Sequence, residues 1–161
     1  MRDFARQHPG QLARSWYVAF FQLPALPERM LCAGNYAWLS RSLVNSILSG
    51  TFTPEDLSTY RQAWSQPGAV TAMLNWYRAV RLQRPPATPR RVRVPVQILW
   101  GDGDAFLDRR LAEAGADECD RYQVSHLRSA SHWVQHEEPA EVNRMLCDFA
   151  DPGLEARAAR E

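Results

Sequence analysis

An acidic turn after an apolar strand, followed later by a histidine in a loop, is the feature that most constrains this chain. Residues 94–100 form an apolar, β-branched run that predicts a strand, and this run leads into the turn Gly101-Asp102-Gly103-Asp104. His132 follows a second predicted strand, in a loop of small residues. This order matches the acid and the base of a nucleophile–base–acid catalytic set. The nucleophile is expected upstream on a strand–turn–helix elbow, and the sequence contains no such elbow.

The amino-acid composition is typical of a folded globular domain. The chain has 161 residues, of which 45% are hydrophobic and 23% charged, and its net charge is +1. This balance predicts a globular core and gives no reason to expect nucleic acid or a membrane as a partner. Three widely spaced cysteines and the lack of an apolar leader or span predict a cytoplasmic protein with free thiols. No histidines have ligand spacing, so we expect neither a metal nor another cofactor.

Residues 1–86 are predicted to form a helical domain. Thr53 followed by Pro54 is a typical helix start, since threonine caps the first turn and proline fits its first position. Pro24, Gly50 and the Pro67-Gly68 pair separate the helical patterns. The expected helices span residues 11–23, 26–48, 53–64 and 69–81.

Residues 87–150 predict a different architecture, in which strands alternate with helices. A proline-rich linker at 84–91 marks the change. The expected order is a strand at 94–100, a helix at 108–116, a strand at 121–126 and a helix at 139–149, with a flexible tail at 151–161. Alternating elements predict a parallel sheet of the α/β class. Because two strands do not make a stable sheet alone, we expect partner strands to be missing and an apolar sheet edge to be exposed.

Two readings are open for each polar residue near the strand ends. Asp104 is either a turn former or a carboxylate that orients a histidine. His132 is either a surface residue or, paired with Asp104, a base. Asp102 is interpreted as a turn former and His136 as an exposed residue at a helix start. The residues around His126 suggest no role for it.

Aromatic residues also allow two readings. Tyr77 is either a core residue at helical spacing or a donor to a developing alkoxide. Trp16, Tyr17 and Phe20 are expected to serve packing unless further evidence gives them a function, and Trp133 is a candidate wall beside His132.

Four segments, in order, resemble the C-terminal half of an α/β-hydrolase of the epoxide hydrolase and dehalogenase group. Residues 15–24 resemble the first lid helix, and Leu74-Asn75-Trp76-Tyr77-Arg78 resembles the lid motif of epoxide hydrolases. Residues 95–107 resemble the penultimate core strand with its acid, and residues 131–143 resemble the histidine loop and last helix. The resemblance implies an incomplete α/β-hydrolase fold, with a helical lid followed by two βα units.

The resemblance also implies roles for named residues. His132 would activate water, Asp104 would orient His132, and Tyr77 would donate to the oxygen of a small apolar epoxide. The second lid tyrosine is expected near Phe20, which cannot donate, so either Tyr17 substitutes or this donor is lost. In a haloalkane or haloacid dehalogenase, the alternative reading, Trp76 or Trp16 would bind the halide; the further lid candidates for binding substrate are Tyr17, Phe20 and Trp133.

The His-Gly-x-Pro oxyanion loop and the Gly-x-Asp-x-Gly elbow of the family do not occur in the sequence. The chain therefore has no candidate nucleophile and is expected to be truncated. The missing half is expected either upstream of Met1 in the gene or on an associating second chain. Whether the chain is an enzyme by itself stays open, and a non-catalytic remnant or interaction module is the third reading.

Overall fold

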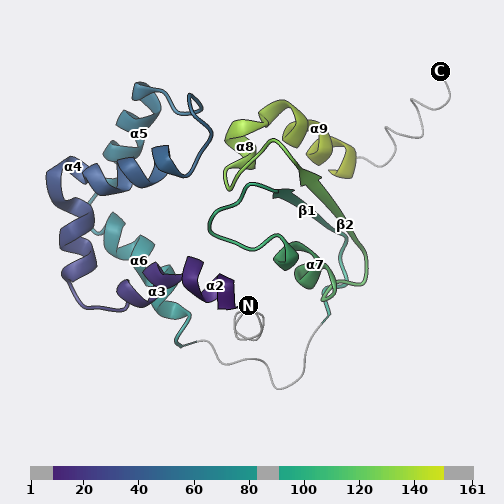
Figure 1. Cartoon of the computed structure of the whole chain (residues 1–161), viewed down its shortest axis with the longest axis horizontal. Coiled ribbons are helices and arrows are strands. Elements are labelled where there is room, and N and C mark those ends of the chain that lie inside the picture. The colour runs from purple at the N-terminus through teal and green to yellow at the C-terminus, as the bar shows by residue number, and fades with distance from the viewer. Residues whose placement is uncertain (1–8, 83–90, 151–161) are drawn as a thin grey trace. The chain divides into compact units, whose positions relative to one another are not determined.

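The computed structural model describes residues 9–82 and 91–150. The chain divides into two compact units, Met1–Arg90 and Arg91–Glu161 (Figure 1). The tail expected at 151–161 lies outside the described residues. No helix in the described parts of the chain is long and apolar enough to cross a membrane.

The first unit is helical and packs around a small apolar core. Leu31, Trp64, Val70 and Leu74 are buried there, and Leu74 is the most completely covered of them. Helix α4 contacts both α5 and α6, so these three helices form the body of the unit. The helices are α2 (Pro9–Arg14), α3 (Trp16–Phe20), α4 (Leu26–Asn45), α5 (Pro54–Trp64) and α6 (Ala69–Ala79).

Helix α5 begins where its sequence predicts. The Thr53 hydroxyl accepts a hydrogen bond from the Asp56 amide at 3.2 Å, and the Asp56 carboxylate accepts one from the Thr53 amide at 2.8 Å. This reciprocal arrangement satisfies amides that the first helical turn leaves unpaired. The expected start with Thr53 as the cap is confirmed.

The single helices expected at 11–23 and 26–48 are wrong in detail. The first is two short helices divided at Ser15, and it ends at Phe20. The second ends at Asn45 and is kinked, because Gly34, Asn35 and Tyr36 have positive φ angles of 57°, 55° and 60°. Glycine and asparagine tolerate this left-handed conformation, which interrupts the helical hydrogen bonds.

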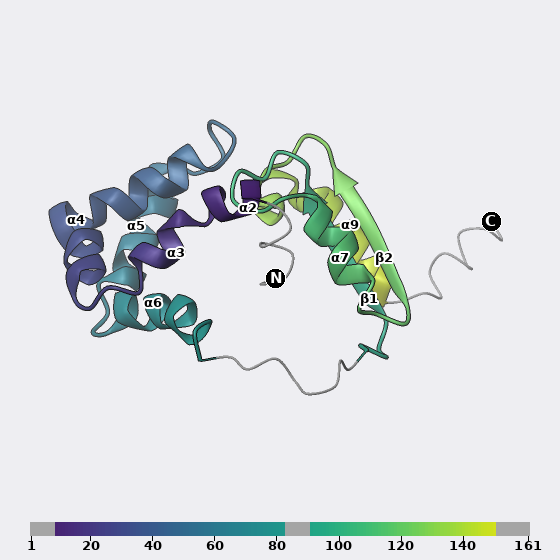
Figure 2. The same cartoon turned by 60° about the horizontal axis from the view of Figure 1, so that its bottom comes forward.

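The second unit is a parallel strand pair between helices. Strands β1 (Val96–Gly101) and β2 (Tyr122–Leu127) pair in register along their whole length. Figures 1 and 2 show α7 (Arg110–Ala116) and α9 (Pro139–Ala150) on opposite sides of this pair, with the short α8 (Val134–Glu137) leading into α9. On the α9 side, Leu99 and Val134 pack against a buried cluster of Leu127, Ala130 and Val142.

The expected strands are displaced by one or two residues. Strand β1 starts after Pro95, which has no amide to donate to a neighbouring strand. Strand β2 is shifted by one residue at each end, and α7 starts at Arg110 instead of residue 108. Helix α8 was not expected from the sequence.

Gly101 lets the loop after β2 cross the end of β1. A Cβ atom at position 101 would lie 1.9 Å from the carbonyl oxygen of Ser131 and 2.8 Å from that of Ala130. Both atoms belong to the backbone of the loop that carries His132, so no side-chain rotation can relieve the overlap. The close crossing therefore requires glycine.

We expect Gly101→Ala to destabilise the second unit by about 3 kcal/mol, a typical cost of forcing extra volume into a packed site. Urea unfolding with hydrogen exchange of the β1 and β2 amides measures this change. Gly115→Ala is the matched control, since a Cβ there meets only the Ile98 side chain, at 3.9 Å. An equal loss in both variants would contradict the role of Gly101.

Candidate active site

Asp104 and His132 meet at the ends of the two strands. The Nδ1 atom of His132 lies 2.8 Å from Oδ2 of Asp104. The Asp104 side chain is 8% exposed and the His132 side chain 34% exposed, so the pair is anchored inside and reaches solvent through the imidazole. An ionised Asp104 favours the tautomer with its proton on Nδ1, which leaves Nε2 as the nitrogen that accepts a proton.

The Asp104 carboxylate is also held by its own turn. Its Oδ1 atom accepts hydrogen bonds from the amides of Phe106 at 2.7 Å and Leu107 at 2.9 Å. Burial raises the pKa of Asp104, but the hydrogen bonds from His132 and the two amides outweigh burial, and the pKa lies below its ordinary value. The site therefore holds an ionised carboxylate beside His132.

Two serine–glutamate contacts shape the loop that carries His132. The carboxylate of Glu137 accepts hydrogen bonds from the Ser131 amide at 2.5 Å and the Ser131 hydroxyl at 2.6 Å. Glu138 accepts a further one from the Ser129 hydroxyl at 2.7 Å. These contacts tie the loop to the end of α8, directly beside His132.

Aromatic rings flank the imidazole of His132. The rings of Phe106 and Trp133 contact it edge-on, at centroid distances of 5.1 Å and 5.3 Å. Trp133 thus lies against His132. His136 is exposed, as its position at a helix start predicts.

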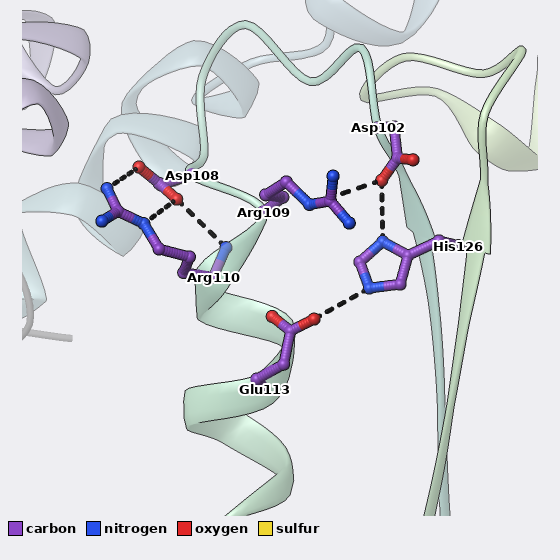
Figure 3. A network of polar contacts seen from close by, with 6 residues as sticks. All are labelled: Asp102, Asp108, Arg109, Arg110, Glu113 and His126. Atoms are coloured by element: carbon purple, nitrogen blue, oxygen red, sulfur yellow. Dashed lines mark hydrogen bonds and ion pairs between the residues drawn. The ribbon is translucent and has the colours of Figure 1, made fainter.

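A second histidine–carboxylate network lies in the same unit, and it corrects the reading of His126 and Asp102 (Figure 3). His126 Nδ1 lies 2.7 Å from the Asp102 carboxylate, and its Nε2 lies 2.9 Å from that of Glu113. The Arg109 guanidinium lies 3.8 Å from Asp102. Asp102 is therefore more than a turn former, and His126 connects the end of β1 to α7.

Tyr77 packs against Tyr17 in the helical unit. Their ring centroids are 5.7 Å apart and nearly perpendicular, and Phe21 lies 5.0 Å from Tyr77. Phe20 instead contacts Phe21 and Trp38. The tyrosine beside Tyr77 is therefore Tyr17, one turn before the position expected from the resemblance. Burial raises the pKa of the Tyr77 phenol, which keeps it protonated.

The two tryptophans considered for halide binding are open to solvent in this chain. Trp76 is 83% exposed and Trp16 is 61% exposed. Each neighbours a tyrosine in sequence, but Tyr17 and Tyr77 are half-buried while both tryptophans are exposed. Packing within the helical unit thus distinguishes the tyrosines from the tryptophans.

Sequence reasoning missed the residues that support the site. The sequence contains small residues before His132 and two glutamates after it, but only the loop geometry shows which serine meets which glutamate. The sequence predicts Gly101 in a turn, but its close contact with the loop depends on the register of two distant segments. Among the described residues, no group of three histidine, cysteine, aspartate or glutamate side chains gathers as metal ligands.

Comparisons with known proteins identify relatives over most of the chain. The chain is 40% identical over 149 residues to the AB hydrolase superfamily protein YfhM of Bacillus subtilis, covering 92% of this chain and 52% of that protein. It is 39% identical over 146 residues to Epoxide hydrolase 2 of Caenorhabditis elegans, covering 86% and 41%. No protein-family model matches the chain.

Solved structures extend this similarity to the fold. An epoxide hydrolase of Bacillus megaterium in complex with an inhibitor matches with a TM-score of 0.77 and 27% identity, over 91% of this chain and 55% of that one. The haloalkane dehalogenase DbeA from Bradyrhizobium elkani matches with a TM-score of 0.60 at 21% identity, which shows a shared fold.

The fold of the chain and its relatives are those of the α/β hydrolases. Within that superfamily, the chain is similar over most of its length to epoxide hydrolases and corresponds to the C-terminal part of these proteins. The chain spans about half the length of the curated relatives it matches.

We expect the Asp104 carboxyl to titrate below its ordinary pKa of 3.8 and this pKa to rise in His132→Phe, where burial is opposed by fewer hydrogen bonds. Because the folded pKa is lowered, Asp104 stabilises the fold above the ordinary pKa, and this stabilisation is lost as the pH falls through the folded value. Carbon-13 NMR of the carboxyl group measures the titration. His136→Phe serves as the exposed control, and a titration at or above 3.8 in the unchanged chain would contradict the account.

Proposed function

We propose that this chain is the cap and the C-terminal core of an enzyme that hydrolyses small apolar epoxides to diols. In this assignment residues 1–86 form the cap, residues 87–150 belong to the core, and 151–161 are a tail. The observation that carries the proposal is the Asp104–His132 contact in a chain similar to epoxide hydrolases.

His132 is the proposed base and Asp104 the acid that orients it. With Asp104 ionised and bonded to Nδ1, the Nε2 atom of His132 takes a proton from water, and the water oxygen attacks the carbonyl of an alkyl-enzyme ester. Asp104 stabilises the imidazolium that results. The bond between the acyl carbon and the alkyl oxygen then breaks while the imidazolium returns its proton to the alkyl oxygen, which releases the diol. The acid formed on the nucleophile loses its proton to solvent and is a carboxylate again.

Tyr77 and Tyr17 are the proposed donors in the earlier ring-opening step. A carboxylate nucleophile attacks an epoxide carbon, the carbon–oxygen bond breaks, and a phenol donates to the oxygen that becomes an alkoxide. The contact between the two tyrosine rings supports epoxide opening over dehalogenation. In dehalogenation, the exposed Trp16 or Trp76 would bind the halide.

The nucleophile is proposed to come from residues outside this chain, together with the strands that complete the sheet. Two polar atoms in β1, Gln97 Oε1 and Trp100 Nε1, are buried and have no hydrogen-bond partner among the described residues. Such groups cost about 1–3 kcal/mol each, so native proteins rarely leave them unpaired. The two-stranded sheet of the described residues is also too small to be stable alone, which supports a core completed by further strands.

The proposed substrate class rests on the product bound to a similar enzyme. A variant of the Bacillus megaterium enzyme was solved with its product, (R)-3-[1]naphthyloxy-propane-1,2-diol, and that protein is 27% identical to this chain. A vicinal diol attached to an apolar group is the product we assign to this chain's site. We propose a cytoplasmic location, since the three cysteines of this chain are free.

The test joins this chain to the unmatched part of the Bacillus megaterium epoxide hydrolase, which completes the core. In this chimaera we expect hydrolysis of an aryl glycidyl ether. Tyr17→Phe and Tyr77→Phe should each lower kcat/KM by about 10²-fold, because each removes one donor to the developing alkoxide.

Tyr60→Phe is the matched control, since it removes a phenol from a different aromatic cluster of the same unit. Its kcat/KM should stay unchanged. A folded chimaera that turns over a chloroalkane and leaves the epoxide intact would replace the epoxide assignment with the dehalogenase reading. A folded chimaera inert to both would favour a non-catalytic remnant.

A further inference from the structure

Arg78 joins α6 to the segment that follows α3. Its Nε atom donates a hydrogen bond to the carbonyl oxygen of Phe21 at 3.0 Å, and its Nη2 atom donates one to the carbonyl oxygen of Leu23, also at 3.0 Å. Arg78 therefore holds the backbone just beyond the end of α3 against α6.

The same guanidinium also holds the start of α4. Its Nη1 and Nη2 atoms donate to the two carboxylate oxygens of Glu28, at 2.6 Å and 3.1 Å. Nη1 also donates to the Asn75 side chain at 3.4 Å, so every N–H group of Arg78 has a partner. The hydrogen bond with Arg78 is the main reason that the pKa of Glu28 lies below its ordinary value. A lysine offers one nitrogen and lacks this planar fork.

Gln22 adds a second tie between the same helices. Its Nε2 atom donates to the carbonyl oxygen of Val18 in α3 at 3.0 Å and to that of Tyr77 in α6 at 3.1 Å. The two ties therefore act on neighbouring residues of α6, one on the Tyr77 backbone and the other through the Arg78 side chain.

These contacts set the separation of the two tyrosines. Tyr17 lies on α3 and Tyr77 on α6, and their rings touch at 5.7 Å between centroids. Tyr17 and Tyr77 are far apart in the sequence. The packing of α3 on α6 therefore decides where their phenols lie.

We propose that Arg78 is the positioning residue of the tyrosine pair, because it fixes α3 and the start of α4 against α6 and so holds the Tyr17 and Tyr77 rings together. The inference deepens the proposed function, on which it depends for what the phenols do. Gln22 assists Arg78 by holding the Tyr77 backbone.

The test uses the 161-residue chain with carbon-13 label in its tyrosine rings. NMR follows the ionisation of the Tyr77 phenol, assigned with Tyr77→Phe, and the cross-relaxation between the Tyr17 and Tyr77 rings. In Arg78→Lys we expect the Tyr77 pKa to fall towards its ordinary value, because the phenol gains solvent, and the signal between the rings to weaken. Circular dichroism verifies that the helices remain.

Arg81→Lys is the matched control, since it makes the same change one turn further along. It should alter neither the Tyr77 pKa nor the cross-relaxation between the Tyr17 and Tyr77 rings. Folded Arg78→Lys with unchanged Tyr77 ionisation and ring contact would overturn the proposal. If Arg78→Lys does not fold, Gln22→Met decides, because it removes only the secondary tie. A smaller change in the same direction supports the proposal, and no change overturns it.

The two failures are distinguishable because this experiment contains no substrate. Intact positioning in a chimaera that hydrolyses no epoxide would refute the proposed function and leave the positioning by Arg78 standing. In an active chimaera, Arg78→Lys should lower kcat by about tenfold or more and change KM little, since misplaced donors act mainly in the transition state.

Discussion

The contact between Asp104 and His132 depends on how closely the histidine loop crosses the end of β1. Gly101 allows this crossing, since a side chain there would overlap the loop backbone. The amide of Gly103 then donates to the Ala130 carbonyl at 3.0 Å, and the glutamate contacts of Ser129 and Ser131 hold the far side of the loop. The register of the two parallel strands therefore places the imidazole beside the carboxylate.

Burial and hydrogen bonding act in opposite directions on Asp104, and hydrogen bonding prevails. This balance keeps a negative charge where a protonated His132 would need it. The His126 network applies the same chemistry to the neighbouring segment, where Asp102 and Glu113 face the two ring nitrogens. The acid turn is thus fixed by a histidine on each of its two aspartates.

Much of the fold could be predicted because its signals are local. Thr53 and Pro54 mark a helix start, and the apolar run before Gly101 marks a strand. The left-handed residues around Gly34 and the division at Ser15 were not predicted, since tertiary packing overrides helical periodicity there. For the same reason the sequence could not choose between Tyr17 and Phe20: the choice depends on how α3 packs on α6.

In the proposed reaction, His132 activates water against an ester formed on a nucleophile from outside this chain. The most direct measurement is intact-protein mass spectrometry of the chimaera carrying His132→Gln, after mixing with an aryl glycidyl ether. The account predicts an adduct with the mass of the whole epoxide, which accumulates because ring opening proceeds while hydrolysis of the ester stops. A folded variant that accumulates no adduct, or one that hydrolyses the epoxide as fast as the unmodified chimaera, would contradict it.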